Sequence, residues 1–429
     1  MNDSMIGYAG VDWAIDGHAV CVVNERGALV TEFDVGHTGE GLVEMCRRIK
    51  GAGALRVAIE RPDGPVVDAL LDAGLEVVVV SSRSVKALRE RYGTSGNKSD
   101  RSDAYVLADC LRTDGHRWRS LQPDSPATIT IRTHVRARKD LVETRVAVAN
   151  QLRAHLRIVF PGAVGLFRDI DSPISLRFLE RFPSANKANW LSEKRLGAWM
   201  RANGYCGRKT ARELHDRLIA APAGISGDEG DARGAIALAY VNVLKTLRIQ
   251  IDELNTRLDE LLDAHPDAHI FRSLPRCATI RAATLLAEIG DCRARFPDAE
   301  SLCSLAGVAP STRASGRHRV VTFRWASDTK LREAICDFAG DSWRGNEWAT
   351  HRYRELRASG KTHPHAERIL ARSWTHIIWR CCKTTPPPTP PGTAATNAST
   401  TKRLDIGLLM RPPACGAADR LRERSRRGM

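Results

Sequence analysis

The chain has 429 residues and a formal net charge of +15, and 43% of its residues are hydrophobic. This length and composition exclude a small disulfide-stapled scaffold, and they allow two or three domains with ample cores. The excess of Lys and Arg is spread along the sequence, which favours a nucleic-acid partner over a merely solvated basic face. Phosphate contacts of this kind predict binding that weakens steeply with salt.

Cysteines and apolar runs indicate the compartment. The eleven cysteines form no CxxC pair, so we expect reduced thiols and find no sign of a disulfide framework or a zinc site. No apolar run is long enough to span a membrane, and no signal peptide is evident. We therefore expect a cytoplasmic, nucleoid-associated protein with no membrane partner.

A first domain is predicted over residues 5–115. Three β-rich runs come first, and helix-like and strand-like runs then alternate, which gives the order β-β-β-α-β-α-β-α. That order is the ribonuclease H topology, so the predicted fold class of this domain is α/β. The runs cover residues 7–12, 19–24, 29–35, 39–49, 55–60, 66–73 and 75–80, followed by a helix that starts near residue 100.

Four carboxylates occupy the ends of these elements. Asp12 ends the first strand and Glu60 ends the fourth, and these two strand ends lie side by side in the ribonuclease H topology. Asp100 and Asp103 begin the last helix, where a spacing of three puts both on one face. Four converging carboxylates repel one another unless a cation neutralises them, and oxygen ligands favour Mg²⁺ or Mn²⁺. Two such ions can clamp the oxygens of a phosphodiester.

The last pair of acids also has a purely structural interpretation. Ser99 can cap the helix, and acids in a first turn complement its positive end. The neighbouring Lys98 and Arg101 could hold a phosphate backbone beside the metals, or they could simply balance the acids. The agreement of four acids in one topology favours the functional interpretation.

Two long helical patterns follow. Residues 126–161 form a basic amphipathic pattern, and residues 231–265 carry apolar side chains at steps of three and four for about three heptads. Such a seam packs against another helix, either the 126–161 helix of the same chain or its equivalent in a partner subunit. Residues 126–265 are therefore predicted as a helical, coiled-coil linker region.

A second, mainly α-helical domain is predicted over residues 266–382, with helices at 279–289, 301–306, 327–338 and 366–379. Its segment 307–319 is rich in Gly, Pro and Ser, so it is predicted to be a loop. This loop carries Ser311 and Ser315 beside several basic side chains. Residues 383–429 are rich in Pro, Thr and Arg, which is typical of a disordered basic tail.

Together these residues resemble the DEDD-motif insertion-sequence transposases, which are bridge-RNA-guided serine recombinases. The resemblance covers about residues 5 to 380 and leaves out the tail. Four acids in order, combined with a Ser-Gly loop, make a specific combination, although each piece alone is weak. The matching segments are 10–12, 59–60 and 98–104 in the first domain, and 282–291, 306–310, 315–316 and 354–361 in the second.

The resemblance implies a RuvC-like ribonuclease H domain, a coiled-coil linker and a smaller transposase domain bearing a serine. It implies that Asp12, Glu60, Asp100 and Asp103 hold Mg²⁺, and that Ser315 attacks DNA to form a covalent phosphoserine link. The implied partners are double-stranded DNA, at the element ends and the target, and a structured guide RNA that chooses the sites. The implied assembly is a dimer to tetramer, in which the acids of one subunit meet the serine of another.

The implied chemistry agrees with the residues of the loop. A serine hydroxyl is a poor nucleophile at neutral pH, and metal ions lower that barrier. Arg313, Arg317 and Arg319 could steady the phosphate charge. Ser311 is a rival nucleophile, and a serine before glycine is also a common turn residue. The Ser-Gly match favours Ser315.

The sequence departs from the family at one turn. The second domain of the family opens with a Pro-Gly-x-Gly turn suited to gripping a nucleic-acid backbone. The matching stretch here, residues 274–280, contains no glycine. This departure puts the local nucleic-acid contact in question.

Two other functions remain open. One is a RuvC-like, metal-dependent nuclease that uses water alone, which a covalent protein–DNA adduct would exclude. The other is a non-enzymatic basic assembly factor with structural acids, which loss of metal binding in an Asp12→Asn variant would argue against. No P-loop and no HExxH motif occur.

Overall fold

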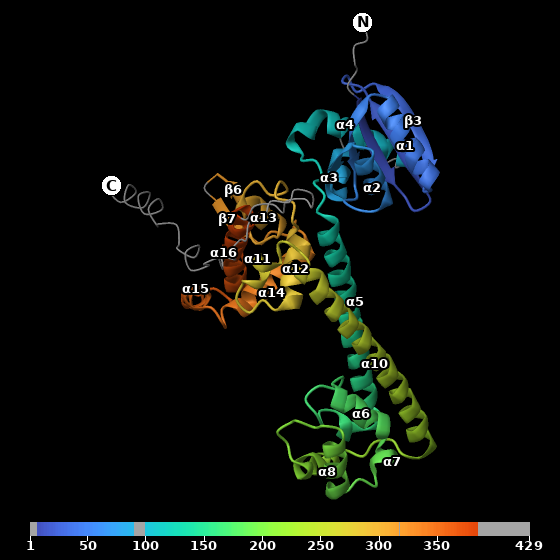
Figure 1. Cartoon of the computed structure of the whole chain (residues 1–429), viewed down its shortest axis with the longest axis vertical. Coiled ribbons are helices and arrows are strands. Elements are labelled where there is room, and N and C mark those ends of the chain that lie inside the picture. Colours follow the sequence, from blue (N-terminus) through green and yellow to red (C-terminus); the bar gives the residue numbers. More distant parts are fainter. Residues whose placement is uncertain (1–6, 90–98, 317, 385–429) are drawn as a thin grey trace, which may run out of the picture. The chain divides into compact units, whose positions relative to one another are not determined.

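The structure is a computed structural model, and it describes residues 7–89, 99–316 and 318–384. The chain divides into two compact units, Met1–Pro123 and Asp124–Met429. Figure 1 shows the helices and strands of both. The predicted tail lies almost wholly outside the described residues, as do Lys98 and Arg317.

The first unit is a five-stranded mixed sheet with helices on both faces (Figure 1). The strand order is β3-β2-β1-β4-β5, in which β1, β2 and β3 pair antiparallel while β4 runs parallel to β1 and β5. The predicted order of elements is confirmed, with α3 as an addition. The elements are β1 (Gly7–Trp13), β2 (Gly17–Val23), β3 (Leu29–Gly36), α1 (Gly39–Gly51), β4 (Ala54–Ile59), α2 (Pro65–Asp72), β5 (Glu76–Val79), α3 (Ser82–Arg89) and α4 (Asp100–Asp114), with a 3-10 turn at Gly115–Arg117.

The sheet of the first unit has an apolar core on each face, because alternate side chains of a strand point to opposite faces. On one face, Val11 packs with Met45 of α1 and Leu70 of α2. On the other face, Ala58 packs with Leu107 of α4. The central strands are thus buried on both faces, as expected for strands with continuous apolar runs.

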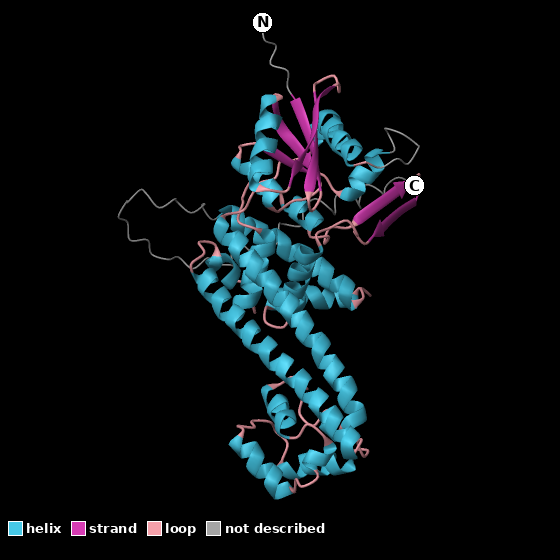
Figure 2. Ribbon diagram, turned by 90° about the vertical axis from the view of Figure 1, so that its right-hand side faces the viewer, coloured by secondary structure: helices cyan, strands magenta, loops and turns pink. Residues whose placement is uncertain are grey.

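The second unit is organised by two long helices, α5 (Pro126–Val159) and α10 (Gly227–Asp263), which lie side by side (Figures 1 and 2). Near one end, Ile131 of α5 and Leu262 of α10 share a core with the C-terminal helices. Near the other end, Leu152 of α5 and Val241 of α10 share a second core with the helices between them. The heptad seam therefore packs within the chain, which confirms the first of the two predicted partners.

The remaining elements of the second unit surround the two ends of this helix pair. Those at the α6–α9 end come from the segment between the two long helices. They are a 3-10 turn (Pro161–Ala163), α6 (Pro173–Arg181), α7 (Ala185–Ala188), α8 (Glu193–Ala202) and α9 (Ala211–Ala220). Those at the other end are α11 (Ala268–Arg272), α12 (Thr279–Ile289), α13 (Ala299–Leu305), β6 (Ser311–Ser315), β7 (His318–Thr322), α14 (Thr329–Ser342), α15 (Glu347–Ala358) and α16 (His363–Thr384).

One local prediction is wrong. Segment 307–319 was predicted as a loop, but most of it forms the antiparallel hairpin of β6 and β7. Gly316 adopts a φ of 54°, a left-handed conformation that glycine tolerates, and this permits the tight turn between the strands. Among the described helices, none combines the length and apolar composition needed to cross a bilayer. The ten described cysteines form no disulfide.

Candidate functional site

Two of the predicted acids lie at adjacent strand ends. β1 and β4 pair in parallel with Val11 opposite Ile59, so Asp12 and Glu60 are the next residues along each strand. Both are half-buried. Because side chains alternate, Asp12 belongs to the same sheet face as Gly10, which is the face covered by α4.

Helix α4 brings the other two acids toward the same end of the sheet. A Cβ atom on Gly10 would lie 2.5 Å from the backbone nitrogen of Ala108, so the helix backbone rests directly on β1. The far end of α4 is fixed by Arg56, whose Nη2 donates to the carbonyl oxygen of Gly115 at 3.3 Å. Arg56 lies in the first half of β4, so α4 runs opposite to β4. Its first turn, with Asp100, is therefore directed toward the strand ends that carry Glu60.

The start of α4 is capped as the sequence predicted. The Ser99 hydroxyl oxygen accepts a hydrogen bond from the backbone nitrogen of Ser102, and the Ser102 hydroxyl oxygen accepts one from the backbone nitrogen of Ser99, each at 3.2 Å. The cap fixes the first turn, and with it the positions of Asp100 and Asp103. Asp100 is exposed, whereas Asp103 is only 2% exposed.

The buried acid, Asp103, forms an ion pair with an arginine. Arg89 of α3 donates two hydrogen bonds to the Asp103 carboxylate, both at 2.5 Å. The sequence does not reveal this ion pair, because nothing in it pairs Arg89 with one acid among four. Arg101 likewise binds the Asp34 carboxylate at 2.6 Å. For Arg101 the predicted phosphate contact competes with this ion pair, as the charge-balancing interpretation expects.

The four acids share one end of the unit but do not form a closed metal site. Within residues 7–89, 99–316 and 318–384, no three His, Cys, Asp or Glu side chains lie close enough together to hold one ion. The donor type suits Mg²⁺, since all four side chains offer oxygen. Full coordination by this set would require Asp103 to leave Arg89. The metal site therefore stays a prediction.

The predicted nucleophile lies at the tip of the hairpin in the second unit. Ser315 is exposed, and it is paired across the strands with His318, whose side chain is also exposed. Arg313 is two residues earlier, so it shares the face of Ser315. Ser311 begins β6 at the base of the hairpin and is less exposed than Ser315. The backbone of Arg319 pairs with Ala314.

His318 is a residue whose position the sequence did not reveal. Residues directly opposite in an antiparallel pair have Cβ atoms about 5 Å apart. An imidazole at that separation can accept a proton from a serine hydroxyl directly or through one water. His318 does not stand out in the sequence, because a predicted loop provides no cross-strand partner.

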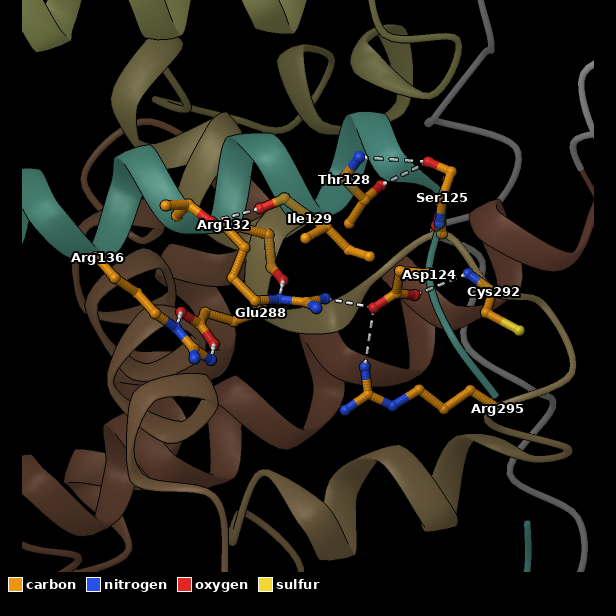
Figure 3. A network of polar contacts seen from close by, with 12 residues as sticks. Asp124, Ser125, Thr128, Ile129, Arg132, Arg136, Glu288, Cys292 and Arg295 are labelled. Carbon is orange, nitrogen blue, oxygen red and sulfur yellow. Dashed lines mark hydrogen bonds and ion pairs between the residues drawn. The ribbon is translucent and has the colours of Figure 1, made fainter. Parts of the chain in front are cut away.

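Part of the second domain's motif is structural. The segment 282–291 contains Glu288, whose buried carboxylate accepts two hydrogen bonds from Arg136 of α5, at 3.1 and 2.8 Å. Figure 3 shows Arg132 and Arg295 converging on Asp124, the residue that leads into α5. These contacts fasten the start of α5 to the end of α12.

The glycine and the last acid of the same segment complete this junction. Gly290 has a φ of 84°, and a Cβ there would lie 2.6 Å from Oδ2 of Asp124. Burial opposes ionisation of Asp291, but hydrogen bonds from His265 and Ser125 outweigh it and lower the pKa of Asp291. The backbone nitrogen of Ser125 donates to this carboxylate at 2.9 Å. We find a packing role for each of these residues and no direct sign of catalysis.

The turn that lacks the family's glycines keeps a glycine-like backbone. Arg276 has a φ of 55°, and among the described residues it is the one non-glycine with a positive φ. Its Nε donates to the Asp341 carboxylate at 2.9 Å, which joins the turn to α14. A residue with a Cβ atom adopts this left-handed conformation only with strain.

Comparisons with known proteins found two matching family models and several relatives. The DEDD transposase family model of the IS110 type matches residues 9–161, and the model described as "Transposase IS116/IS110/IS902 family" matches residues 268–354. The mini-circle putative transposase for IS117 of Streptomyces coelicolor is 32% identical over 399 residues, which cover 89% of this chain and 95% of that protein.

Two further relatives match less of the chain. The putative transposase y4uE of Sinorhizobium fredii is 34% identical over 199 residues, or 45% of this chain and 55% of that protein. The IS110 uncharacterized 43.6 kDa protein of Streptomyces coelicolor is 26% identical over 312 residues, or 72% of this chain and 76% of that protein. Both matched models and all three relatives carry the name of a transposase or of an insertion element.

Proposed function

The chain belongs to the IS116/IS110/IS902 family of transposases, and we propose that it cleaves and rejoins DNA strands through a serine nucleophile aided by a divalent-metal site. The observation that carries the proposal is the position of Ser315. It is exposed at the tip of a hairpin whose same face carries Arg313 and His318. A nucleophile in this position can reach a phosphodiester of a large duplex.

The reaction is a phosphoryl transfer without any redox change. The Oγ atom of Ser315 attacks phosphorus, so an Oγ–P bond forms while the bond from phosphorus to one deoxyribose oxygen breaks. The serine proton passes to a base, for which His318 is a candidate, and the leaving oxygen takes up a proton. The positive charge of Arg313 favours the transition state, in which negative charge builds on the phosphate oxygens. In the reverse step, the hydroxyl of a new strand end attacks phosphorus, the Oγ–P bond breaks, and the serine hydroxyl is restored.

The acid-bearing end of the first unit is the proposed site for Mg²⁺ or Mn²⁺. Asp12, Glu60, Asp100 and Asp103 would hold the ions, which supply Lewis-acid stabilisation of the phosphate when bound. The sheet order and the antiparallel packing of α4 support a RuvC-like ribonuclease H fold for this unit. The ion pair between Arg89 and Asp103 neutralises one acid in the absence of metal.

The proposed partners follow from the family and from the charge. Double-stranded DNA at the element ends and the target is the substrate, and a net charge of +15 suits a polyanion. A structured guide RNA is proposed to select the sites, with the protein contacting shape and backbone. The proposed assembly is a homo-oligomer, from dimer to tetramer.

A covalent-adduct assay tests the reaction class. Full-length protein is mixed with end-labelled DNA carrying the element junction, RNA transcribed from the element flanks, and Mg²⁺, and the products are separated on a denaturing gel. We expect a protein-linked band that requires Mg²⁺ and disappears in Ser315→Ala. Cleaved DNA without any adduct would instead support the nuclease that uses water, and the serine mechanism would then be wrong.

A further inference from the structure

A large cavity lies at the end of the second unit formed by helices α6–α9, far along the chain from the hairpin and its serine. It has a volume of about 890 Å³, which falls within the range of roughly 300–1,000 Å³ that is typical of small-ligand sites. Its walls come from the segment before α6, the segment between α8 and α9, and α9 itself. The proposed reaction assigns no role to this part of the chain.

The charge of the cavity has one sign. Four cationic side chains line it, and no Asp or Glu is among its lining residues. Neither Arg208 nor Arg217 makes an ion pair or hydrogen bond with any described residue. Lys209 is exposed, and Arg168 has one carboxylate nearby, that of Asp169 at 3.9 Å. Uncompensated cations around a cavity favour an anionic occupant.

A second cavity of the same unit differs in having three acidic residues among its lining residues. It has a volume of about 620 Å³ and lies among α5, α12 and α14. Its Arg136 is held by Glu288 at 2.8 Å, and its Arg281 is held by Asp337 at 3.0 Å. Because these two cations already have carboxylate partners, they are less available to bind an anionic ligand.

The lining of the basic cavity also includes aromatic rings. Tyr205 is half-buried, and its ring centroid lies 5.6 Å from that of the buried Phe167. The phenol group of Tyr205 makes no hydrogen bond with any described residue. A Cβ on Gly207 would lie 2.7 Å from Cε2 of Tyr205 and closer still to its Cζ and hydroxyl, so the ring occupies its position only because residue 207 is glycine.

We infer that this cavity binds an unpaired nucleotide of a single-stranded or looped nucleic acid. Aromatic rings beside a basic surface are the usual means of binding unstacked bases, because every base offers a π face while the cations contact the flanking phosphates. Tyr205 stacks on the base, and Arg208, Lys209 and Arg217 contact phosphates. A duplex offers phosphates but no unstacked base, so it lacks half of this recognition. The inference rests on the proposed function only in taking nucleic acid as the partner.

Cys206 provides a local probe, since it lines the cavity and is exposed. Burial raises the pKa of the Cys21, Cys277 and Cys303 thiols to about 12, so these react slowly at neutral pH. Alkylation of the full-length chain by N-ethylmaleimide, read by peptide mapping, therefore reports on this cavity. The assay uses the Ser315→Ala chain, so cleavage cannot alter the probe and failure of the proposed reaction cannot affect the result.

The oligonucleotides are a single-stranded RNA of about 16 nucleotides, the DNA of the same sequence, and the corresponding duplex. We expect one or both single strands to slow the alkylation of Cys206, and the two arms show whether RNA or DNA is preferred. Protection by the duplex alone, or by none of the three, would overturn the inference. The protection assay needs no substitution inside the cavity, so its result holds even if a cavity variant fails to fold.

Variants provide the second arm. Tyr205→Ala should weaken the binding that protects Cys206 by about 5- to 150-fold, while Tyr205→Phe should retain it. Lys209→Glu should relieve protection, whereas Lys194→Glu should not, because Lys194 is an exposed lysine of α8 outside the cavity. Equal effects of the two lysine variants would show that general charge, and not this cavity, accounts for protection.

Discussion

The acid-bearing end of the first unit and the hairpin of the second unit are built in opposite ways. Asp103 is 2% exposed and is held by a two-bond ion pair with Arg89. Among the hairpin side chains that the structure describes, all but the half-buried Ser311 are exposed, and Val320 and Val321 are 54% and 60% exposed. One half of the proposed chemistry is thus fixed inside a packed core, and the other half lies on a projecting ribbon.

This difference follows from what each half must do. Carboxylates that repel one another stay together only in a rigid frame, which the packing of α4 on β1 provides. A nucleophile that meets a wide duplex must project from the surface. A two-stranded hairpin is marginally stable by itself, so we expect contacts with a partner to order it. The following predictions test this contrast.

The largest effect is expected from the acids at the strand ends. Asp12→Asn or Glu60→Gln should slow strand cleavage by at least about 100-fold, because metal stabilisation of the phosphate contributes several kcal/mol. DNA affinity should be retained, since carboxylates do not attract phosphate. Cleavage rates and gel-shift affinities measure the two effects. Asp16→Asn, an exposed acid beyond the end of β1, is the matched control and should remain active.

Breaking the buried ion pair is expected to have the next largest effect. Arg89→Ala leaves the Asp103 carboxylate buried without its partner, which should cost about 3 kcal/mol of folding stability. Mg²⁺ should restore part of that loss if Asp103 is a ligand, and thermal unfolding with and without Mg²⁺ measures this. Arg101→Ala breaks an exposed pair and should cost at most about 1 kcal/mol. An unfolding temperature of Arg89→Ala that does not respond to Mg²⁺ would remove Asp103 from the ligand set.

Asp291, at the junction between α5 and α12, is expected to make the stability of the second unit depend on pH. The pKa of Asp291 is lower in the folded chain than in the unfolded chain, so its contribution to stability is present above pH ~4 and is lost as the pH falls through the lowered folded value. Asp291→Asn should cost roughly 2 kcal/mol at pH 7. The difference in unfolding free energy between parent and variant should become smaller at acidic pH. A difference in unfolding free energy that stays constant from pH 7 to strong acid would contradict the lowered pKa of Asp291.

The smallest effect is expected at the strained turn. Arg276 has a φ of 55°, which an L-residue with a Cβ adopts at a cost of about 1 kcal/mol. Arg276→Gly and Arg276→Ala both lose the contact with Asp341. The difference between their unfolding free energies therefore reports the cost of the backbone conformation alone. The glycine variant should be the more stable of the two by about 1 kcal/mol in denaturant unfolding. Equal stability would mean that the turn relaxes when the arginine is removed.

Much of the fold could be predicted from periodicity. Long apolar repeats identified α5 and α10 within a few residues, and alternating runs gave the element order of the first unit. The Ser99 cap was also predicted correctly, because capping depends on residues close in sequence. Local signals of this kind are strong wherever one face of an element is buried.

The contacts that decide the site could not be predicted in the same way. The hairpin escaped prediction because Ser311–Ser315 is short and polar and shows no apolar alternation. The pairing of Arg89 with Asp103 depends on how α3 packs against α4, and no local pattern encodes that. The four acids were predicted from topology, whereas their charge partners depend on tertiary packing that topology does not specify.

The most direct test of the account is to locate the covalent link by mass spectrometry of the adduct formed with DNA. Trypsin cuts after Arg313 and Arg317, so residues 314–317 form one peptide in which Ser315 is the sole hydroxyl, while Ser311 leaves in the peptide 296–313. The account predicts a nucleotide attached to the 314–317 peptide. A nucleotide on the 296–313 peptide would show that Ser315 at the hairpin tip is not the nucleophile.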